Sequence, residues 1–451
     1  MNKPFGWRFT SPLLLGSTLN PINSSMLATG LVGIGLDFHK GPAATASLIS
    51  VLYLCSAVAQ PTMGKLAQVF GARRVFIAGQ IVLLVAGVIG AAAPNFAILL
   101  LSRALIGIGT SAAYPTAMAL VRSRAEQART GVPSQVLANF SIAAQVTMVI
   151  GLPLGGVLAG GFGWRAIFFV NVPLAAVTLL FTLLGVARDE PLTRTSWRGL
   201  LAAVDVLGVV LFAATITLLL LFLSGLSSPD WWLLLMAGLA GAALLAWEWR
   251  ATSPLVDVRM LVHNRRLVRT YLRQALVALG IYTALYGISQ WMEQAAGYSA
   301  AQVGLIMLPL SLVSMIIARV VSTLGRVRLP LVLTGGFLIL TGTAMGLITS
   351  SASVWVLVGI SVLFGLANGF GGFANQATLY VQAPAADIAV ASGLYRTFNY
   401  VGAIFSATLI GLTFGTAATD AGLHAVALVL AAIGVVFLIL TTLDDKIPAV
   451  V

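Results

Sequence analysis

The amino-acid sequence alternates between long apolar runs and short polar loops. Fourteen runs are long enough to cross the apolar core of a bilayer, which takes roughly 20 helical residues. Because backbone polar groups in lipid must be paired within the segment, each run is predicted to be an α-helix. The predicted spans are residues 12–36, 44–64, 75–93, 96–121, 134–159, 166–186, 203–224, 231–248, 268–291, 301–321, 329–349, 353–379, 387–413 and 422–442. This pattern predicts an all-α integral membrane protein with 14 transmembrane helices.

One basic, glycine-containing loop occurs twice in the chain. Residues 64–74 read GKLAQVFGARR and residues 318–328 read ARVVSTLGRVR, each between two apolar runs. Gly71 and Gly325 occupy the same position in the two copies, and an arginine closes both. Internal repeats are typical of transporters built from related helical bundles. The loop therefore predicts a fold with two halves.

The predicted helices divide as six, two and six around this repeat. Residues 1–186 are predicted to form an N-terminal six-helix bundle, and residues 263–451 a C-terminal one. Residues 187–262 hold two extra transmembrane helices and a cytoplasmic linker. The two extra helices are rich in leucine and nearly free of polar residues, which suits a position against lipid better than one along a substrate route.

Composition and charge also indicate that most of the chain lies in lipid rather than in water. Hydrophobic residues make up 59% of the chain and charged residues 8%, against about 25% charged residues in a soluble domain. A net charge of +12 would suggest nucleic acid as a partner of a soluble protein, but here the basic residues lie in loops between apolar runs. With both termini in the cytoplasm, the positive-inside rule is obeyed by all lysines and arginines except Lys40, Arg103, Arg165 and Arg396. We expect a multi-pass protein of the inner (cytoplasmic) membrane that contacts lipid and binds no nucleic acid.

Residues that support enzymatic chemistry are scarce. The histidines, His39, His263 and His424, are scattered in loops or at the ends of spans, so no metal cluster or catalytic triad is visible. The phosphate-binding sequence G-x-x-x-x-G-K-[ST] is absent, which argues against ATP-driven pumping. We therefore expect no enzyme activity, no metal and no cofactor.

Polar residues within the spans of the N-terminal half are candidates for a substrate site. Arg103 lies inside the hydrocarbon, where an ionisable group is costly and faces a cavity or a partner. It is either a functional group that faces a cavity or a structural arginine bonded to backbone groups. Three further residues share one helix face around Pro21 and either line a cavity or bond neighbouring helices. The candidate substrate-binding residues of this half are Asn20, Asn23, Ser24, Arg103 and Tyr114.

The C-terminal half contributes a second set. A polar and aromatic stripe repeats every four residues in the span 268–291, and amides lie among small apolar residues of the span 353–379. Such a stripe lines a pocket or serves ordinary packing, whereas buried amides require protein or water partners. We predict that both sets face a central cavity. The candidates are Tyr282, Tyr286, Gln290, Asn368, Asn375 and Gln376.

Acidic residues are missing from the middle of the predicted spans. Asp37 and Glu293 lie at outer helix ends, while Asp205, Asp257 and Asp387 lie near inner ends. Proton-coupled transporters commonly carry the proton on an intramembrane carboxylate. A cavity rich in amides and aromatic rings, and positive through Arg103, favours neutral or anionic substrates over cations.

The motifs, taken in order, resemble those of the major facilitator superfamily, specifically its fourteen-helix branch of drug:proton antiporters. Residues 64–74 resemble the signature G-x-L-A-D-R-x-G-R-K/R, and residues 103–109 the fourth-helix motif R-x-x-Q-G. Residues 151–156 resemble the antiporter motif G-P-x-x-G-G, and residues 164–173 the run W-R-x-x-F-x-x-N-x-P. Glu248 and residues 254–259 resemble the segment that follows the two extra helices in this branch.

The resemblance implies export of drug-like or amphipathic small molecules in exchange for protons, by a monomer. It also implies that conformational gating involves Gly64, Lys65, Gly71, Arg73, Arg74, Pro153, Gly155 and Gly156. For Arg103 it implies substrate-anion binding or a role in proton coupling. The chain departs from the family pattern at several positions, among them Val69 in place of the signature arginine and Pro153, displaced by one residue. Gln68 replaces the acid of the signature loop, Ile106 replaces the glutamine of the fourth-helix motif, and Asn20 lies where the branch usually carries an aspartate. Proton coupling therefore lacks its usual residues.

Two other functions stay open at this stage. One is a proton-independent facilitator or uptake transporter for a neutral or anionic metabolite. The other, a membrane sensor or scaffold that transports nothing, is disfavoured because no appended soluble domain is visible to receive a signal.

Overall fold

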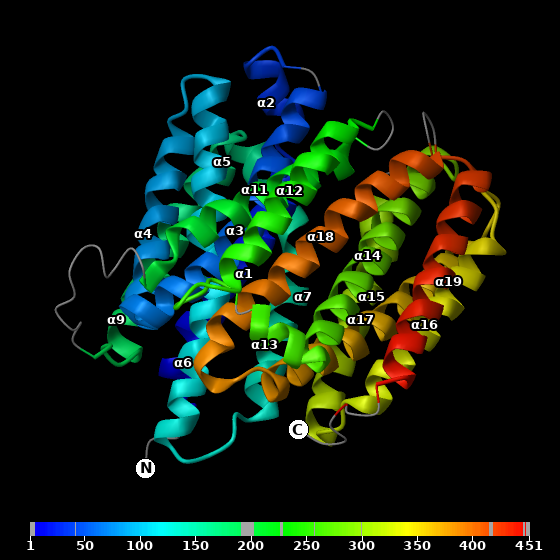
Figure 1. Ribbon diagram of the computed structural model, residues 1–451. Helices are drawn as coiled ribbons and strands as arrows, with labels where there is room; N and C mark the ends of the chain where they lie inside the picture. The colour runs from blue at the N-terminus through cyan, green and yellow to red at the C-terminus, as the bar shows by residue number, and fades with distance from the viewer. Residues whose placement is uncertain are drawn as a thin grey trace.

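The computed structural model describes residues 5–40, 42–190, 203–225, 229–256, 258–298, 300–414, 418–444 and 447. Within those ranges the chain is helical and contains no β-strand (Figure 1). The helices are α1 (Trp7–Ala28), α2 (Leu31–Asp37), α3 (Pro42–Phe70), α4 (Ala72–Ala91), α5 (Phe96–Ser111), α6 (Ala113–Gln127), α7 (Ser134–Phe162), α8 (Arg165–Phe169), α9 (Asn171–Gly185), α11 (Val206–Ser224), α12 (Trp231–Glu248), α13 (Val258–His263), α14 (Arg265–Gln294), α15 (Ala300–Leu324), α16 (Arg328–Gly346), α17 (Val354–Gln382), the 3₁₀ turn η1 (Ala385–Asp387), α18 (Ile388–Phe414) and α19 (Asp420–Thr442).

The number of membrane-crossing helices is confirmed only in part. Twelve helices of the described residues are long and apolar enough to cross a membrane. The two other predicted spans coincide with α1 and α7, which are 22 and 29 residues long but are not among the twelve. The predicted total of fourteen is therefore not confirmed.

Several predicted spans are interrupted in the structure. The predicted helix 12–36 is divided into α1 and α2, because the chain turns at Thr29 and Gly30. A Cβ on Gly30 would lie 2.6 Å from the Cδ1 atom of Ile167, so only glycine allows this close approach without displacing that side chain. The spans 96–121 and 166–186 are likewise divided, at Ala112 and Val170.

Packing sorts the helices into two groups. One apolar core joins residues of α1 to α5 and of α7 to α9, including Leu52, Leu83 and Phe168. A second joins residues of α14 to α19, including Trp291 and Phe364. Helices α11 and α12 pair with each other, and α11 also packs on α3 and α18, one helix from each group (Figure 1).

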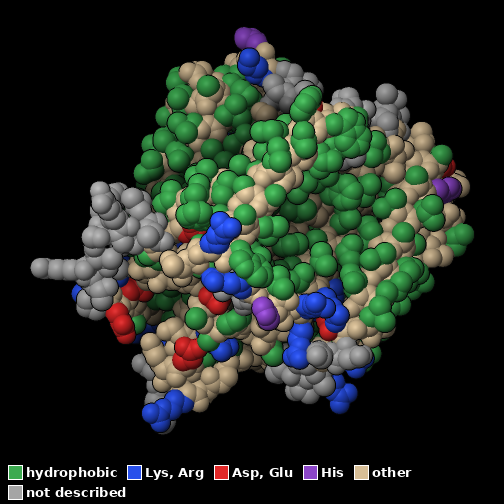
Figure 2. Space-filling view, viewed as in Figure 1, with side chains coloured by type: hydrophobic (Ala, Val, Ile, Leu, Met, Phe, Trp, Pro, Cys, Tyr) green, Lys and Arg blue, Asp and Glu red, His purple; other side chains and the backbone are tan. Residues whose placement is uncertain are grey.

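The outer surface has the character expected of a protein in lipid. Hydrophobic side chains cover most of the face in Figure 2, and many large ones are exposed, including Trp231, Trp232 and Leu239 on α12. Lysine and arginine side chains gather towards the end of the molecule where α1 begins and α19 ends. We call this end the base, and the other end, where α2 lies, the top.

Both copies of the repeated loop place a glycine at positive φ. Gly71, between α3 and α4, has φ +94°, and Gly325, near the end of α15, has φ +62°. Left-handed φ values carry little cost for glycine, which explains why both copies place it there. In the first copy, the Asp189 carboxylate accepts hydrogen bonds from the backbone N–H groups of Arg73 (3.1 Å) and Arg74 (2.8 Å). This carboxylate satisfies N–H groups at the start of α4 that have no partner within the helix. Its negative charge also interacts favourably with the positive end of the α4 dipole.

Trp164 and Arg165 form hydrogen bonds that hold α2 at the top of the first group. The indole of Trp164 donates to Asp37 at 2.8 Å, and the guanidinium of Arg165 donates to the same oxygen at 3.0 Å. Together they hold the pKa of Asp37 below its ordinary value, the indole hydrogen bond being the larger cause. These hydrogen bonds therefore join α2 to α8.

A buried ion pair fastens the base of the second group. Arg273 on α14 donates to Asp444 at 3.0 Å, and both side chains are fully buried. Arg269, one helical turn earlier, donates to the other carboxylate oxygen at 3.0 Å. Asp444 therefore connects the residues after α19 to the start of α14 and offsets two cationic side chains.

Replacing Asp444 by asparagine is expected to lower the free energy of unfolding by about 3–5 kcal/mol, because removing one partner leaves a buried charge uncompensated. Thermal unfolding of the detergent-purified protein measures the effect. The matched control is Glu126→Gln, which breaks the exposed Arg122–Glu126 pair and should cost no more than about 0.5 kcal/mol. Equal melting temperatures for the two variants would contradict the structural role of Asp444.

Candidate functional site

Asn20 lies where the two helix groups meet. Its Nδ2 atom donates to the Ser56 hydroxyl on α3 (2.9 Å) and to the Thr110 hydroxyl on α5 (2.8 Å). Its Oδ1 atom accepts a hydrogen bond from the Tyr400 hydroxyl on α18 (2.9 Å). The Gln60 amide also donates to the Tyr400 hydroxyl at 3.3 Å. A single amide therefore connects three helices of the first group to one of the second.

Four tyrosines surround this contact from both groups. Tyr53 on α3 and Tyr400 on α18 have ring centroids 5.7 Å apart. Tyr282 and Tyr286, one turn apart on α14, stack at 5.8 Å. Tyr286 lies near Tyr53 of α3 and is 41% exposed, so it lies at the group interface with open space beside it. The predicted stripe on α14 therefore faces the other group, whereas Tyr53 and Tyr400 were missed from sequence.

Arg396 on α18 is a second arginine within a membrane span. Its guanidinium carbon lies 4.0 Å from the centre of the Tyr114 ring, a cation–π contact with α6. Tyr114 packs edge-on against Phe140 of α7 at 6.4 Å. The Nε atom of Arg396 is buried without a hydrogen-bond partner, and no carboxylate is paired with Arg396 in the described part of the chain. Its position inside a predicted span was the signal that could have selected it.

Arg103 has a different environment. It is 1% exposed and donates from Nε to the Leu48 carbonyl (3.1 Å) and from both terminal nitrogens to the Asn23 carbonyl (3.4 and 3.5 Å). This is the geometry of a structural arginine. Asn23 itself exchanges two amide hydrogen bonds with Asn171 on α9, at 2.6 and 2.9 Å. Both residues therefore hold helices of the first group together.

The remaining predicted amides lie on α14 and α17 of the second group. Asn375 donates to the Gln274 side chain (3.0 Å), which in turn donates to Asn399 of α18 (2.8 Å). Gln376 accepts a hydrogen bond from Ser141 of α7 (2.8 Å), which joins the two groups. Of the other predicted residues, Ser24 donates to the Asn20 carbonyl, Asn368 is buried on α17, and Gln290 is exposed near the end of α14.

Below the tyrosines, α3 and α18 are in direct backbone contact. A Cβ on Gly64 would lie 2.6 Å from the Ala389 carbonyl oxygen, and one on Gly393 would lie 2.6 Å from that of Gln60. The Thr397 hydroxyl donates to the Ala57 carbonyl at 2.6 Å. Small residues are what allow two helices to approach this closely in a membrane.

Further hydrogen bonds between the groups lie near the base. Tyr380 on α17 donates to the Met118 carbonyl on α6 (2.6 Å), and Ser134 on α7 donates to the Ser322 carbonyl on α15 (2.8 Å). Gln68, where the signature motif has an acid, donates to the Ala386 carbonyl (2.7 Å). These contacts and the α3–α18 packing together form what we call the seal.

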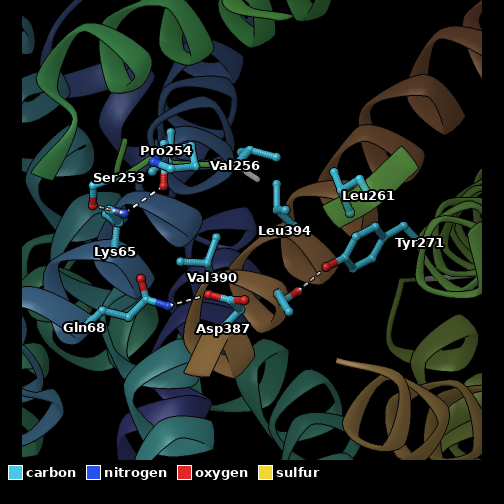
Figure 3. Close-up of a pocket in the computed structure, with 12 residues that line it drawn as sticks. Lys65, Gln68, Ser253, Pro254, Val256, Leu261, Tyr271, Asp387, Val390 and Leu394 are labelled. Carbon is cyan, nitrogen blue, oxygen red and sulfur yellow. Dashed lines mark hydrogen bonds between the residues drawn. The ribbon is translucent and has the colours of Figure 1, made fainter. Parts of the chain in front are cut away.

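Lys65 holds the segment that follows the extra helices. Its ammonium donates to the Ser253 hydroxyl (3.0 Å) and to the Pro254 carbonyl (2.7 Å), as Figure 3 shows. These residues border a cavity of about 200 Å³ that reaches Asp387 and Tyr271 of the second group. The signature lysine therefore links α3 to the segment between α12 and α13.

The predicted gating residues fall into three environments. Gly64 and Lys65 lie at the seal, while Gly71, Arg73 and Arg74 form the turn that Asp189 caps. Gly155 packs against the Met26 carbonyl of α1, but Gly156 faces open space. The side chains of Pro153 and Glu293, and the whole of Asp257, lie outside the described part of the structure. Among described residues, no three His, Cys, Asp or Glu side chains form a group able to hold a metal ion.

Comparisons with known proteins place this geometry in a wider context. An uncharacterized MFS-type transporter of Bacillus subtilis (strain 168), YwoD, is 32% identical over 92% of this chain and 91% of its own length. The lincomycin resistance protein of Streptomyces lincolnensis is 30% identical over 75% of this chain and 70% of its own. The drug efflux pump JefA of Mycobacterium tuberculosis (strain CDC 1551 / Oshkosh) is 27% identical over 88% of this chain and 78% of its own.

Solved structures share the fold. The human organic anion transporter MFSD10 (TETRAN) aligns with a TM-score of 0.67 at 16% identity, over 96% of this chain and 99% of its own. The proton:xylose symporter XylE aligns with a TM-score of 0.65 at 14% identity, over 99% of this chain and 97% of its own. Residues 13–407 match the family description "Major Facilitator Superfamily". The chain is therefore a multi-pass membrane transporter of the Major Facilitator Superfamily.

Proposed function

We propose that the protein exports drug-like or amphipathic small molecules by alternating access, in exchange for protons. The observation that carries this proposal is the tyrosine-lined site between the two helix groups, closed towards the base by the seal. A site at the junction of two bundles is where secondary transporters bind substrate. Several relatives with names that denote drug resistance or drug efflux support the substrate class.

The site favours neutral and anionic substrates over cations. Its described side chains include five tyrosines, several amides and the Arg396 guanidinium, but no carboxylate to pair with a cation. An arginine with a buried donor and an aromatic neighbour suits a planar anionic group. We place Asn20, Tyr53, Tyr114, Tyr282, Tyr286, Arg396 and Tyr400 at the substrate site, and we assign Arg103 and Asn23 to its scaffold.

The membrane arrangement belongs to the same proposal. We propose that α1 and α7 also cross the bilayer, which brings the total to fourteen spans, and that the base faces the cytoplasm of a cell whose inner membrane holds the protein as a monomer. The gathering of arginines at the base supports this orientation. Residues 1–186 and 263–451 are then the two bundles that rock, with residues 187–262 as the extra helices and their linker.

A matched pair of amphiphiles tests the role of Arg396. For a fluorescent aromatic carboxylic acid, Arg396→Gln is expected to weaken binding about 10- to 100-fold, because a hydrogen bond to a charged group contributes about 1.5–3 kcal/mol. Binding of the uncharged methyl ester should stay unchanged, and Arg396→Lys should restore part of the affinity for the acid. An equal loss for acid and ester would refute the assignment.

The close contact between α3 and α18 at Gly393 can be tested by adding a methyl group there. Gly393→Ala is expected to shift the conformational equilibrium away from the sealed state by about 5- to 150-fold, because overpacking costs about 1–3 kcal/mol. The readout is disulfide formation between cysteines placed at Gln68 and Asp387, in a Cys55→Ser background that removes the native thiol. The control is Gly411→Ala on the same helix, where a Cβ meets open space. Unchanged cross-linking in Gly393→Ala would contradict the seal.

An imposed pH gradient separates antiport from the alternative function. In proteoliposomes, we expect the gradient to drive substrate accumulation on the acidic side, and substrate addition to release protons in the opposite direction. A facilitator for a neutral or anionic metabolite would equilibrate substrate at the same rate with and without the gradient. Flux that ignores the gradient would therefore reject proton antiport and leave the facilitator.

A further inference from the structure

Two buried acids meet where the extra helices pair. Asp205 precedes α11 and is 5% exposed, whereas Glu248 ends α12 and is fully buried. A Cβ on Gly208 would touch a carboxyl oxygen of each, so the two carboxyl groups lie side by side. Two ionised carboxylates in this position would repel each other, because both offer only acceptors, whereas one shared proton would let them hydrogen-bond.

The hydrogen bonds around the pair indicate where that proton resides. Asp205 accepts from the backbone N–H of Gly208 (3.1 Å) and the indole of Trp247 (2.7 Å) on one oxygen, and from the N–H of Leu255 (2.9 Å) on the other. Three N–H donors suit a carboxylate. Glu248 instead accepts one bond, from the Val256 N–H at 3.3 Å, and its Oε2 atom is buried without a partner. Burying an oxygen without a hydrogen-bond partner costs far less free energy in a neutral carboxyl group than in an anion.

Charged and titratable groups from other elements lie beside the segment Ser253–Val256, whose backbone binds the pair. Lys65 on α3, Tyr271 on α14 and Asp387 in η1 line the cavity that borders this segment. Lys65 donates to Ser253 and Pro254, and Arg259 donates to the Ala251 carbonyl at 3.0 Å. Neither acid of the pair takes part in an ion pair recorded for the described ranges. Neutralisation of the pair by a proton is consistent with all of these contacts.

We propose that Asp205 and Glu248 form a proton-binding site, in which one proton resides on Glu248 and is donated to Asp205. On release, the O–H bond of Glu248 breaks and the proton passes to water, leaving two carboxylates. The cavity of about 200 Å³ that is lined by Leu255 and Val256 gives water access to the segment covering the pair. That this proton is the one exchanged for substrate rests on the proposed function, whereas proton binding itself does not.

The segment Ser253–Val256 connects the proton site to the seal. On one side, the N–H groups of Leu255 and Val256 bind the two acids. On the other side, Ser253 and Pro254 accept hydrogen bonds from Lys65, which lies next to Gly64 at the α3–α18 contact. Loss of the proton places two anions in contact, and their repulsion loosens this segment. Proton occupancy therefore biases the equilibrium between sealed and open states.

Infrared difference spectra of the purified protein between two pH values test the site directly. We expect the carbonyl-stretch band of a protonated carboxylic acid to titrate in the wild type and to be lost in Glu248→Gln. The control Glu126→Gln, which removes an exposed acid, should keep the band. Persistence of the band in Glu248→Gln would overturn the proposal.

A second variant covers the case in which Glu248→Gln does not fold. Asp205→Asn removes the neighbouring negative charge, so the band should titrate on the order of one pH unit lower. An unchanged midpoint would overturn the shared-proton arrangement. A band that disappears when sodium is added at constant pH would identify a metal-cation site instead of a proton site.

Transport assays test whether the proton bound by Asp205 and Glu248 is the one exchanged for substrate. Glu248→Gln in proteoliposomes is expected to exchange substrate across the membrane while no longer moving protons with it. If the variant lacks the infrared band and still couples substrate to protons, the pair binds a proton that transport does not use. If the wild type ignores a pH gradient, the proposed antiport fails, and the infrared band alone decides whether the proton site exists.

Discussion

The contact between α3 and α18 is the constraint on which the rest of the structure depends. These helices belong to different halves of the fold, and glycines bring their backbones together at Gly64 and Gly393. Where the backbones separate, larger side chains fill the space, and these are the tyrosines of the central site. The same pair of helices therefore closes one end of the route and borders the site above it.

Hydrogen bonding at the interface follows from the low polarity of the surroundings. An amide or hydroxyl group buried in a membrane protein needs a partner, and around Asn20 most partners come from other helices. Tyr400 is the partner from the opposite half, so its bond to Asn20 exists only in conformations that bring the halves together. Such a bond stabilises one state of a rocking transporter without stabilising the other, which is the property that a gate requires.

The family's usual acids are absent, and the structure shows what occupies their places. Gln68 bonds to a backbone carbonyl across the seal, and Asn20 bonds to hydroxyl groups. Neither amide titrates, so these two positions carry no charge at any pH. The acids of the extra helices, Asp205 and Glu248, are instead buried together beside the segment that Lys65 holds. The proposed proton site therefore lies on the helices between the bundles.

The sequence by itself determined the helical spans, the repeated turn and the polar residues that face the interface, because hydropathy and glycine conformation are local properties. Gly71 and Gly325 occupy matching turns with positive φ in the two copies of the repeat, and Asn20, Tyr282 and Tyr286 lie between the halves. Only the tertiary structure decided which polar groups meet. Arg103 and Arg396 are both intramembrane arginines in the sequence, yet one bonds to backbone carbonyls and the other faces Tyr114. Their roles depend on partner residues that are distant in the sequence, and a local sequence pattern does not show which distant residues come into contact.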